Sequence, residues 1–247
     1  MEPEEDAYGQ ELMSYYKSRY AFEAFERDDG FLNANIGAAE YFSRYADWRS
    51  HEKAAIRYAK GRCLDVGCGA GRVALYLQAK GRRVTGIDES PLAIKVCRLR
   101  GMKDAKVMHI EDAGEFKQGS FDTILLYGVN FNLMQSRQKA KQILKAFYRI
   151  TSPNGVVIAE TRDPYLTSNP VHFAYHKRNL ARGRMAGQQR GRIRFLQYAS
   201  RWSDFLFVSK GELEGILGES GWKVRRFIDS TDFKKDGRFF AIIEKER

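Results

Sequence analysis

The chain of 247 residues contains little cysteine and no long run of apolar residues. Its three cysteines, Cys63, Cys68 and Cys97, form no C-x-x-C pair and no Cys/His ligand spacing, which argues against a disulfide framework and a structural zinc site. The longest apolar runs, ILLY at 124–127 and VVIA at 156–159, are strand-sized and far shorter than a membrane span. The opening MEPEEDAYGQ is acidic, where a signal peptide would be basic and then apolar. These absences favour a reduced, cytoplasmic globular protein that holds no metal and does not enter a membrane.

Positive charge is in excess, but it is unevenly distributed. The chain has 42 Lys and Arg against 31 Asp and Glu, a formal net charge of +11. Residues 164–203 hold eight positive side chains and no acid, whereas the first thirty residues hold nine acids and three bases. The eight are Lys177, Arg178, Arg182, Arg184, Arg190, Arg192, Arg194 and Arg201. Two interpretations stay open: the two segments lie near one another or are solvated, or the basic segment binds an anionic substrate or a nucleic acid.

The middle of the chain alternates short apolar runs with helical patterns. The strand-like runs are 62–66, 83–88, 105–110, 121–127 and 155–160. The helix-like stretches between them are 71–80, 91–100 and 135–150. Connections this short predict βαβ units, and therefore an α/β domain whose parallel sheet carries helices on both faces.

The two ends of the chain follow other patterns. Apolar spacing predicts helices over 8–28 and 38–60, so that residues 1–50 form an N-terminal helical arm or lid. Residues 51–247 then form the main domain, in which 164–203 is a basic insertion on the substrate side, after the fifth strand.

Beyond the fifth strand, the alternation at 192–195 predicts an exposed strand that 205–208 pairs with. Ser209 and Glu212 form a capping box for a helix over 210–219. Two further strands are expected at 222–228 and 238–244.

The stretch CLDVGCGAGR at 63–72 follows a strand and opens a helix, the context in which a glycine motif is informative. Gly67 and Gly69 permit positive φ and close approach of a ligand, and Gly71 permits the helix to pack on the sheet. A dinucleotide site needs G-x-G-x-x-G, but counting from Gly67 the final position is Arg72. The spacing is therefore wrong for a nicotinamide or flavin dinucleotide.

Carboxylates near this turn indicate the ligand. Asp65, two residues before Gly67, would repel a pyrophosphate but attract an ammonium or sulfonium group. Asp88 ends the next strand, where an acid accepts two hydrogen bonds from a ribose diol. Asp112 follows the third strand and could accept a bond from an exocyclic adenine amine. Cation, ribose and adenine in this order describe S-adenosylmethionine.

The sequence resembles the class I, Rossmann-like S-adenosylmethionine-dependent methyltransferases, in a branch of small-molecule type, over about residues 40–163 and 222–244. LDVGCGAG matches the first motif of the family, and Asp88 its ribose-binding acid. FDTILLYGV at 121–129 resembles the motif of the fourth strand, and SPNGVVIAE at 152–160 the turn and fifth strand.

The resemblance implies a seven-stranded, mostly parallel sheet whose last strand, near 238–244, is antiparallel. It implies S-adenosyl-L-methionine as methyl donor and S-adenosyl-L-homocysteine as product. The residues that it implies for donor binding are Asp65, Gly67, Cys68, Gly69, Gly71, Asp88, Glu89, Asp112, Ala113, Tyr127 and Gly128.

The acceptor is not readable from motifs. Methyl transfer is an in-line displacement in which orientation supplies much of the rate, and a general base is needed only for a protonated nucleophile. No catalytic residue stands out, and the candidates on the acceptor side are Asp163, Tyr165, His172 and His176, with Glu160, Arg162 and Tyr175 as further groups. His172 and His176 would share a face of a helix, whereas His51 and His109 are interpreted as structural.

Three functions remain open. A small-molecule acceptor, with an anionic group as one option, is favoured because no nucleic-acid module is recognisable. An RNA methyltransferase that uses the Arg-rich 164–203 segment to bind phosphates is the alternative. The third is a protein that binds the donor without turnover. The aromatic residues of the arm either pack or cover the donor as a lid; they are Tyr8, Tyr15, Tyr16, Tyr41 and Trp48.

Overall fold

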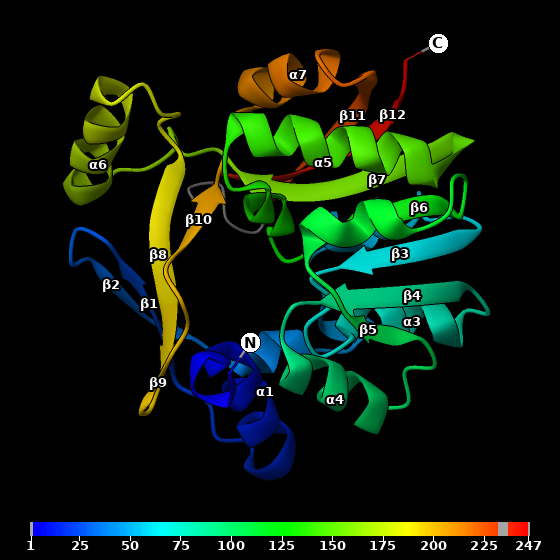
Figure 1. Cartoon of the computed structure of the whole chain (residues 1–247), viewed down its shortest axis with the longest axis horizontal. Coiled ribbons are helices and arrows are strands. Elements are labelled where there is room, and N and C mark those ends of the chain that lie inside the picture. The colour runs from blue at the N-terminus through cyan, green and yellow to red at the C-terminus, as the bar shows by residue number, and fades with distance from the viewer. Residues whose placement is uncertain (1, 232–236, 247) are drawn as a thin grey trace.

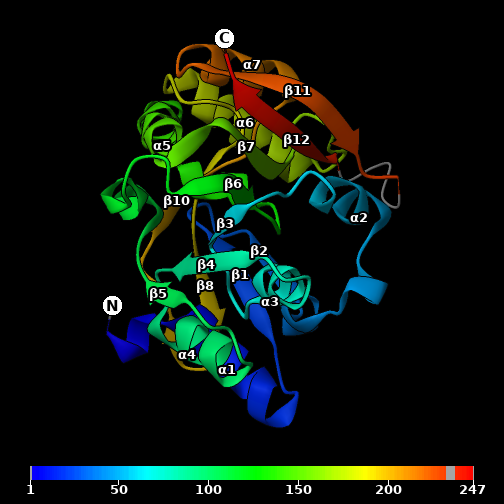
Figure 2. The ribbon, with the colours of Figure 1, turned by 90° about the vertical axis from the view of Figure 1, so that its right-hand side faces the viewer.

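The computed structural model describes residues 2–231 and 237–246, and its strands form two sheets (Figures 1 and 2). The larger sheet has seven strands in the order β11-β12-β7-β6-β3-β4-β5. These strands are β3 (Arg62–Val66), β4 (Arg83–Asp88), β5 (Ala105–Val107), β6 (Phe121–Leu126), β7 (Thr151–Arg162), β11 (Trp222–Asp229) and β12 (Arg238–Lys245). Its helices are α2 (Ser50–Ile56), α3 (Arg72–Ala79), α4 (Pro91–Leu99), α5 (Arg137–Ile150) and α7 (Lys210–Gly218), with 3-10 turns η4 (Ile110–Glu115) and η5 (Asn130–Met134).

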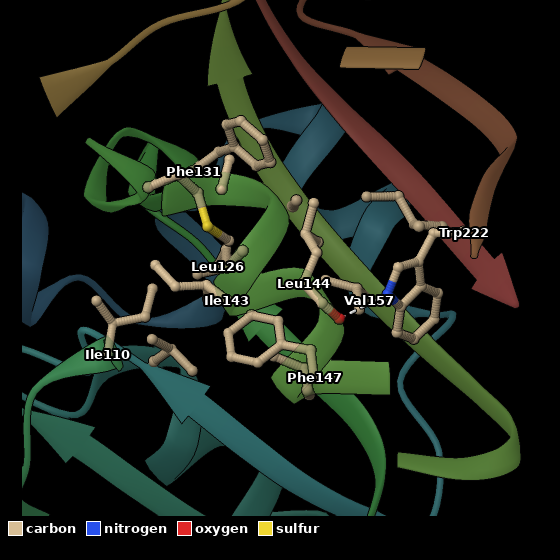
Figure 3. Packing of buried hydrophobic residues seen from close by; sticks show 14 of the residues in the cluster. Ile110, Leu126, Phe131, Ile143, Leu144, Phe147, Val157 and Trp222 are labelled. Atoms are coloured by element: carbon tan, nitrogen blue, oxygen red, sulfur yellow. Dashed lines mark hydrogen bonds between the residues drawn. The ribbon is translucent and has the colours of Figure 1, made fainter. Parts of the chain in front are cut away.

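Successive residues of the central strands pack into different clusters because side chains alternate along a strand. Leu64 of β3 lies in a buried cluster with residues of α5 and α7, and Cys63 lies in another with residues of α2, α3 and α4. Figure 3 shows the first cluster, in which the indole N–H of Trp222 donates to the carbonyl oxygen of Leu144 at 2.9 Å. The expectation of an α/β domain with helices on both faces is confirmed.

Strand directions also follow the expectation. β5, β4, β3, β6 and β7 pair in parallel along the sheet. β12 is antiparallel to both of its neighbours, β7 and β11. The seven-stranded, mostly parallel sheet with an antiparallel last strand is therefore confirmed, although β5 is shorter than the predicted 105–110.

The smaller sheet joins the N-terminal arm to the basic insertion. Its order is β10-β8-β1-β2, with β9 attached to β8. Figure 1 shows it beside the larger sheet, with β8 upright at the left. Its strands are β1 (Glu23–Arg27), β2 (Leu32–Ile36), β8 (Gln188–Phe195), β9 (Tyr198–Ala199) and β10 (Ser203–Leu206). Since β1 pairs with β8, the arm and the insertion form one structural unit.

The arm is not wholly helical, and the predicted helices over 8–28 and 38–60 are wrong in part. Helix α1 (Ala7–Ser18) ends where Arg19 adopts a left-handed conformation (φ 63°), and the chain then enters β1. The second range holds the 3-10 turns η2 (Ala38–Phe42) and η3 (Tyr45–Asp47) and only the seven residues of α2; a further turn, η1 (Pro3–Glu5), precedes α1. Local spacing missed β1 because its partner β8 is remote in sequence, and tertiary pairing overrides local propensity.

The region after β7 agrees better with the sequence. Phe205 and Leu206 of β10 pair with β8 as expected, but they lie opposite Gln189 and Gln188 and not opposite the 192–195 stretch, which pairs with β1 and β9. The Ser209–Glu212 capping box begins α7. Helix α6 (Pro170–Ala181) is an addition. Of the expected domain ranges 1–50 and 51–247, residues 1, 232–236 and 247 lie outside the described residues. In the described ranges, every helix is too short or too polar to cross a bilayer.

Ion pairs connect the acidic arm to the basic insertion. Glu26 of β1 binds both Arg192 and Arg194 of β8. Asp28 likewise pairs with Arg178, and Glu5 with Arg201. Arg184 and Arg190 pair instead with Asp204 of β10, which lies outside the arm. The interpretation that the two segments lie near one another is confirmed, and six of the eight cations already have acidic partners.

Candidate active site

The turn between β3 and α3 lies in the left-handed region of backbone conformation. Gly67 (φ 67°) and Gly69 (φ 54°) adopt it at little cost because they lack a Cβ. A Cβ on Gly67 would lie 2.6 Å from Nδ2 of Asn130, and a Cβ on Gly69 would lie 2.5 Å from the hydroxyl of Tyr8. The backbone N–H of Gly67 donates to the carbonyl oxygen of Ile87 at 2.9 Å, which fastens the turn to β4.

Asp88, at the end of β4, is buried against this turn. Its carboxylate accepts hydrogen bonds from the backbone N–H groups of Gly69 (2.9 Å) and Ser90 (3.0 Å). Burial raises the pKa of Asp88 to about 6, and these two N–H groups oppose that rise. The side chain therefore holds the turn in place and also retains the position expected of the ribose-binding acid.

Asp65, at the end of β3, is also buried. It accepts a hydrogen bond through Oδ2 from the N–H of Ala74 in α3 at 3.2 Å. Burial raises the pKa of Asp65 to about 7, although the positive charge of Arg72 lowers it. Arg72 is shared, since its guanidinium lies 2.7 Å from Glu52 and stacks over Trp48. A cationic group of a ligand beside Asp65 would compensate for the desolvation of this carboxylate.

Glu160, at the end of β7, organises the loop after β6. It accepts hydrogen bonds from the N–H groups of Gly128 (2.9 Å) and Val129 (3.0 Å), and its other oxygen lies 3.2 Å from Nε2 of His51. Burial raises the pKa of Glu160, but His51, Arg238 and the Val129 N–H outweigh it and hold this pKa below its ordinary value. Val129 has a φ of 67°, which is strained for a β-branched residue, and Glu160 fixes this conformation.

The same loop closes over the glycine turn. The Asn130 amide donates to the carbonyl oxygens of Val66 (3.0 Å) and Gly67 (2.8 Å). The buried Tyr127 hydroxyl donates to the carbonyl oxygen of Glu52 in α2 at 3.3 Å. These bonds bring the ends of β3 and β6 and the helix α2 together at one edge of the sheet.

A cavity of about 50 Å³ lies between the glycine turn and the arm. Tyr8 of α1 and Tyr41 of η2 line its arm side, with ring centroids 5.3 Å apart. Asp6 holds α1 in place by accepting hydrogen bonds from the Ser90 hydroxyl (2.9 Å) and the Leu92 N–H (3.1 Å) at the start of α4. The arm is therefore docked directly on the region where a donor is expected.

Two carboxyl groups face each other inside the arm. Glu11 of α1 and Glu23 of β1 are almost wholly buried. Burial, and then the adjacent Glu11 carboxyl, raises the pKa of Glu23 to about 10. Both groups also raise the pKa of Tyr41, after the larger effect of burial. A proton held by Glu23 keeps this pair from being two adjacent buried charges.

The residues implied for donor binding are brought together only in part. Six of them line the cavity: Asp65, Gly67, Cys68, Gly69, Tyr127 and Gly128. Gly71 packs near Cys97, and Asp88 lies under the turn. Glu89 is exposed, with its carboxylate 3.7 Å from His109, and Asp112 is exposed beside the buried Ala113.

The four candidate catalytic residues lie apart from this cavity. Asp163 accepts a bond from the Tyr165 N–H at 2.9 Å, and the Tyr165 hydroxyl donates to Glu212 at 2.9 Å. His172 and His176 lie on α6, and burial, with Arg27 next, lowers the pKa of each. Within the described residues, none of the four lines the cavity.

The sequence did not assign the roles of three residues. Glu160 is a candidate base or anchoring group for the acceptor from the sequence, and in the structure it anchors the 128–129 backbone. Asn130 and Tyr8 had no assigned contact with the glycine turn. The one available signal was the abrupt end of the apolar run VVIA in a carboxylate, since a charge at the end of a buried strand needs partners.

The order of the seven strands and the turn between β3 and α3 define a class I, Rossmann-like methyltransferase fold. Residues 64–159 match the family model of a methyltransferase domain. Over residues 64–159 the chain is therefore similar to the methyltransferase domains of this class.

Known proteins resemble the chain at two levels. A ubiquinone biosynthesis O-methyltransferase from Xanthomonas oryzae pv. oryzae (strain PXO99A) is 31% identical over 126 residues, which are 49% of each chain. The chain thus spans about half the length of the curated relatives that it matches. A methyltransferase from Bacteroides fragilis, crystallised with S-adenosyl-L-homocysteine, superposes with a TM-score of 0.83 at 23% identity and covers 100% of this chain and 98% of that one. A methyltransferase from Methanosarcina mazei has a TM-score of 0.61 at 19% identity, over 77% and 95% of the two chains. These two structures share the fold.

Proposed function

We propose that this protein transfers a methyl group from S-adenosyl-L-methionine to a small-molecule acceptor by in-line displacement. The observation that carries the proposal is the pair of buried carboxylates, Asp65 and Asp88, on either side of a glycine turn that a Cβ would block. When bound, S-adenosyl-L-methionine supplies an electrophilic methyl group. The chain's own residues bind the donor, orient the acceptor and exclude water.

The donor residues divide the work by chemistry. Asp65 faces the cavity and suits the positive charge of the methionyl ammonium. Asp88 suits the ribose hydroxyls. The backbone of Gly67, Cys68, Gly69 and Gly71 permits close approach. The other residues implied for donor binding surround the adenine and form the wall of the site. They are Glu89, Asp112, Ala113, Tyr127 and Gly128.

Residues 1–50 act as a lid in this proposal. The cavity under the arm is about 50 Å³, whereas sites for ligands of this size are about 300–1,000 Å³. Entry of the donor thus requires α1 to move, which withdraws the Tyr8 hydroxyl from Gly69. The contacts of Asp6 with Ser90 and Leu92 would break on opening and form again on closure.

The acceptor belongs between the lid and the carboxyl ends of the strands, where ligands of open α/β sheets bind. Asp163, Tyr165, His172 and His176 remain candidates for contacts with it. The ion pairs of the 164–203 segment leave it fewer cations for an anionic acceptor or for RNA. The Xanthomonas relative is named a ubiquinone biosynthesis O-methyltransferase, and this name supports a small molecule as the acceptor.

The test is incubation of the protein with methyl-labelled S-adenosyl-L-methionine and a lysate separated into small-molecule, RNA and protein pools. We expect label in the small-molecule pool and none with the Gly69→Val variant, whose side chain blocks the turn. Label confined to RNA would replace this proposal with the RNA methyltransferase. Tight binding of S-adenosyl-L-homocysteine with no labelled pool would indicate donor binding without turnover.

A further inference from the structure

A second and larger hollow lies at the opposite end of the parallel sheet from the glycine turn. Its volume is about 610 Å³, within the range of about 300–1,000 Å³ that is usual for ligand sites. It is lined where β3, β4 and β6 begin, at Arg62, Arg83 and Phe121. Because β3 runs from this hollow to the glycine turn, the two sites are separated by the length of the strand.

The floor of the hollow is apolar. Cys63, Val84 and Phe121 are buried there, and Phe116 packs edge-on against Phe121 with ring centroids 5.0 Å apart. The partly buried ring of Phe116, backed by Phe121, offers a surface for a flat, apolar part of a ligand.

The rim is cationic. Among the described residues, five positive side chains and one acid, Asp104, line the hollow. The five are Arg62, Arg82, Arg83, Lys103 and Lys106. Arg62 is bound by Asp122, and Lys106 lies 4.0 Å from Asp104. In the part of the chain that the structure describes, Arg82, Arg83 and Lys103 form no ion pair. Arg82 lies near the floor, since its charge lowers the pKa of Cys63, although burial raises that pKa to about 11.

This distribution differs from that in the basic insertion. Six of the eight cations of residues 164–203 are paired with acids. The basic insertion therefore accounts for little of the uncompensated positive charge behind the net charge of +11. At the hollow, three cations that have no ion pair within residues 2–231 and 237–246 line one concave surface. A concave cluster of like charges concentrates counter-ions of the opposite sign.

We propose that this hollow binds a nucleotide, with its phosphate groups on Arg82, Arg83 and Lys103 and its base on the apolar floor. A rim of cations over an apolar floor matches a ligand that is anionic at one end and flat and apolar at the other. The volume suits one mononucleotide rather than a longer strand. The site is independent of the methyl-donor site and of its acceptor.

The test is calorimetric titration with ADP in the presence of excess S-adenosyl-L-homocysteine, so that binding at the donor site does not contribute. We expect saturable binding of ADP that weakens as salt is raised. Pyrophosphate and adenosine, each of which satisfies only one half of the hollow, should bind more weakly than ADP. If pyrophosphate bound as tightly as ADP, the proposal that the base binds the apolar floor would be wrong.

Charge reversal locates the site. Arg83→Glu and Lys103→Glu should each weaken ADP binding by about tenfold or more, because an anion then meets a carboxylate. Arg226→Glu is the matched control, since Arg226 is exposed on β11 away from the hollow. The milder variant Arg83→Gln covers the case in which Arg83→Glu fails to fold. Unchanged ADP affinity in the rim variants, or tight binding of an oligoadenylate RNA that ADP does not displace, would refute the proposal. If the protein failed to bind the donor, the comparison of the rim variants with Arg226→Glu would still locate the ADP site.

Discussion

The carboxylate of Asp88 accepts a hydrogen bond of 2.9 Å from the backbone N–H of Gly69. This bond joins the end of β4 to the turn that follows β3. A residue expected to bind ribose thus also shapes the backbone beside which the donor would lie. Substitution at Asp88 therefore affects both the ligand and the turn, and the two effects can be measured separately.

Asp88→Ala should weaken binding of S-adenosyl-L-homocysteine by about 1–3 kcal/mol through lost hydrogen bonds to a charged group. It should also lower the melting temperature of the ligand-free protein, because the Gly69 and Ser90 N–H groups lose their acceptor. Asp88→Asn keeps one acceptor oxygen. Its ligand affinity and its melting temperature should therefore lie between those of the wild type and those of Asp88→Ala. Calorimetry and thermal unfolding measure these effects. An affinity equal to that of the wild type in Asp88→Ala would show that the ribose assignment is wrong.

Gly69→Ala should destabilise the protein by about 1–2 kcal/mol, because φ at this position is in the left-handed region. The new Cβ would also meet the Tyr8 hydroxyl. The double variant Gly69→Ala/Tyr8→Phe should recover part of the loss, with Tyr8→Phe alone as the reference. Denaturant unfolding of the four proteins gives the coupling. Strict additivity would mean that Tyr8 does not contact the turn.

Glu23→Gln should change how stability depends on pH. Burial and the Glu11 carboxyl raise the pKa of Glu23 in the folded state to about 10, from an ordinary value of 4.5. The unfolded state therefore releases this proton first, and stability falls as pH rises from 4.5 towards 10. A neutral amide removes this contribution. Between pH 6 and pH 9 the melting temperature of the variant should therefore fall less than that of the wild type. Each kcal/mol of stability corresponds to about 2–4 °C.

The matched control is Glu214→Gln, at an exposed position of α7. It should reproduce the pH dependence of the wild type. If Glu23→Gln also reproduced it, the carboxyl pair would not be buried as described.

Glu160→Ala should cost about 2–4 kcal/mol, because two backbone N–H groups and His51 lose a charged acceptor. The pKa of Glu160 lies below its ordinary value in the folded state, since its bonds to His51 and Val129 and the Arg238 charge outweigh burial. Its contribution is therefore present above pH 4.5 and is lost as pH falls. The difference in unfolding free energy between wild type and variant should shrink on acidification. A constant difference down to low pH would contradict this role.

The central sheet was predictable because its signals are local. Strands such as 62–66 and 83–88 are short apolar runs bounded by turns, and they match β3 and β4 residue for residue. The Ser209–Glu212 capping box likewise fixes the start of α7 within four residues of sequence. The glycine turn combines a strand, three glycines and a helix in one continuous stretch.

The arm and the site around it were less predictable because their contacts are remote. β1 is a strand only because β8 pairs with it, and Glu160 is an anchor only because β6 ends beside it. The role of Tyr8 depends on how α1 docks on α4 through Asp6. None of these relationships leaves a periodic pattern in the sequence.

The pairing of Glu26 with Arg192, across 166 residues of chain, bears on the order of assembly. During synthesis the arm emerges before β3 to β7, and its partner strand β8 emerges only after them. The arm therefore lacks its sheet partner while the strands from β3 to β7 are being made. The smaller sheet can be completed only after β8 has emerged, so it joins segments of the chain that are made at well-separated times.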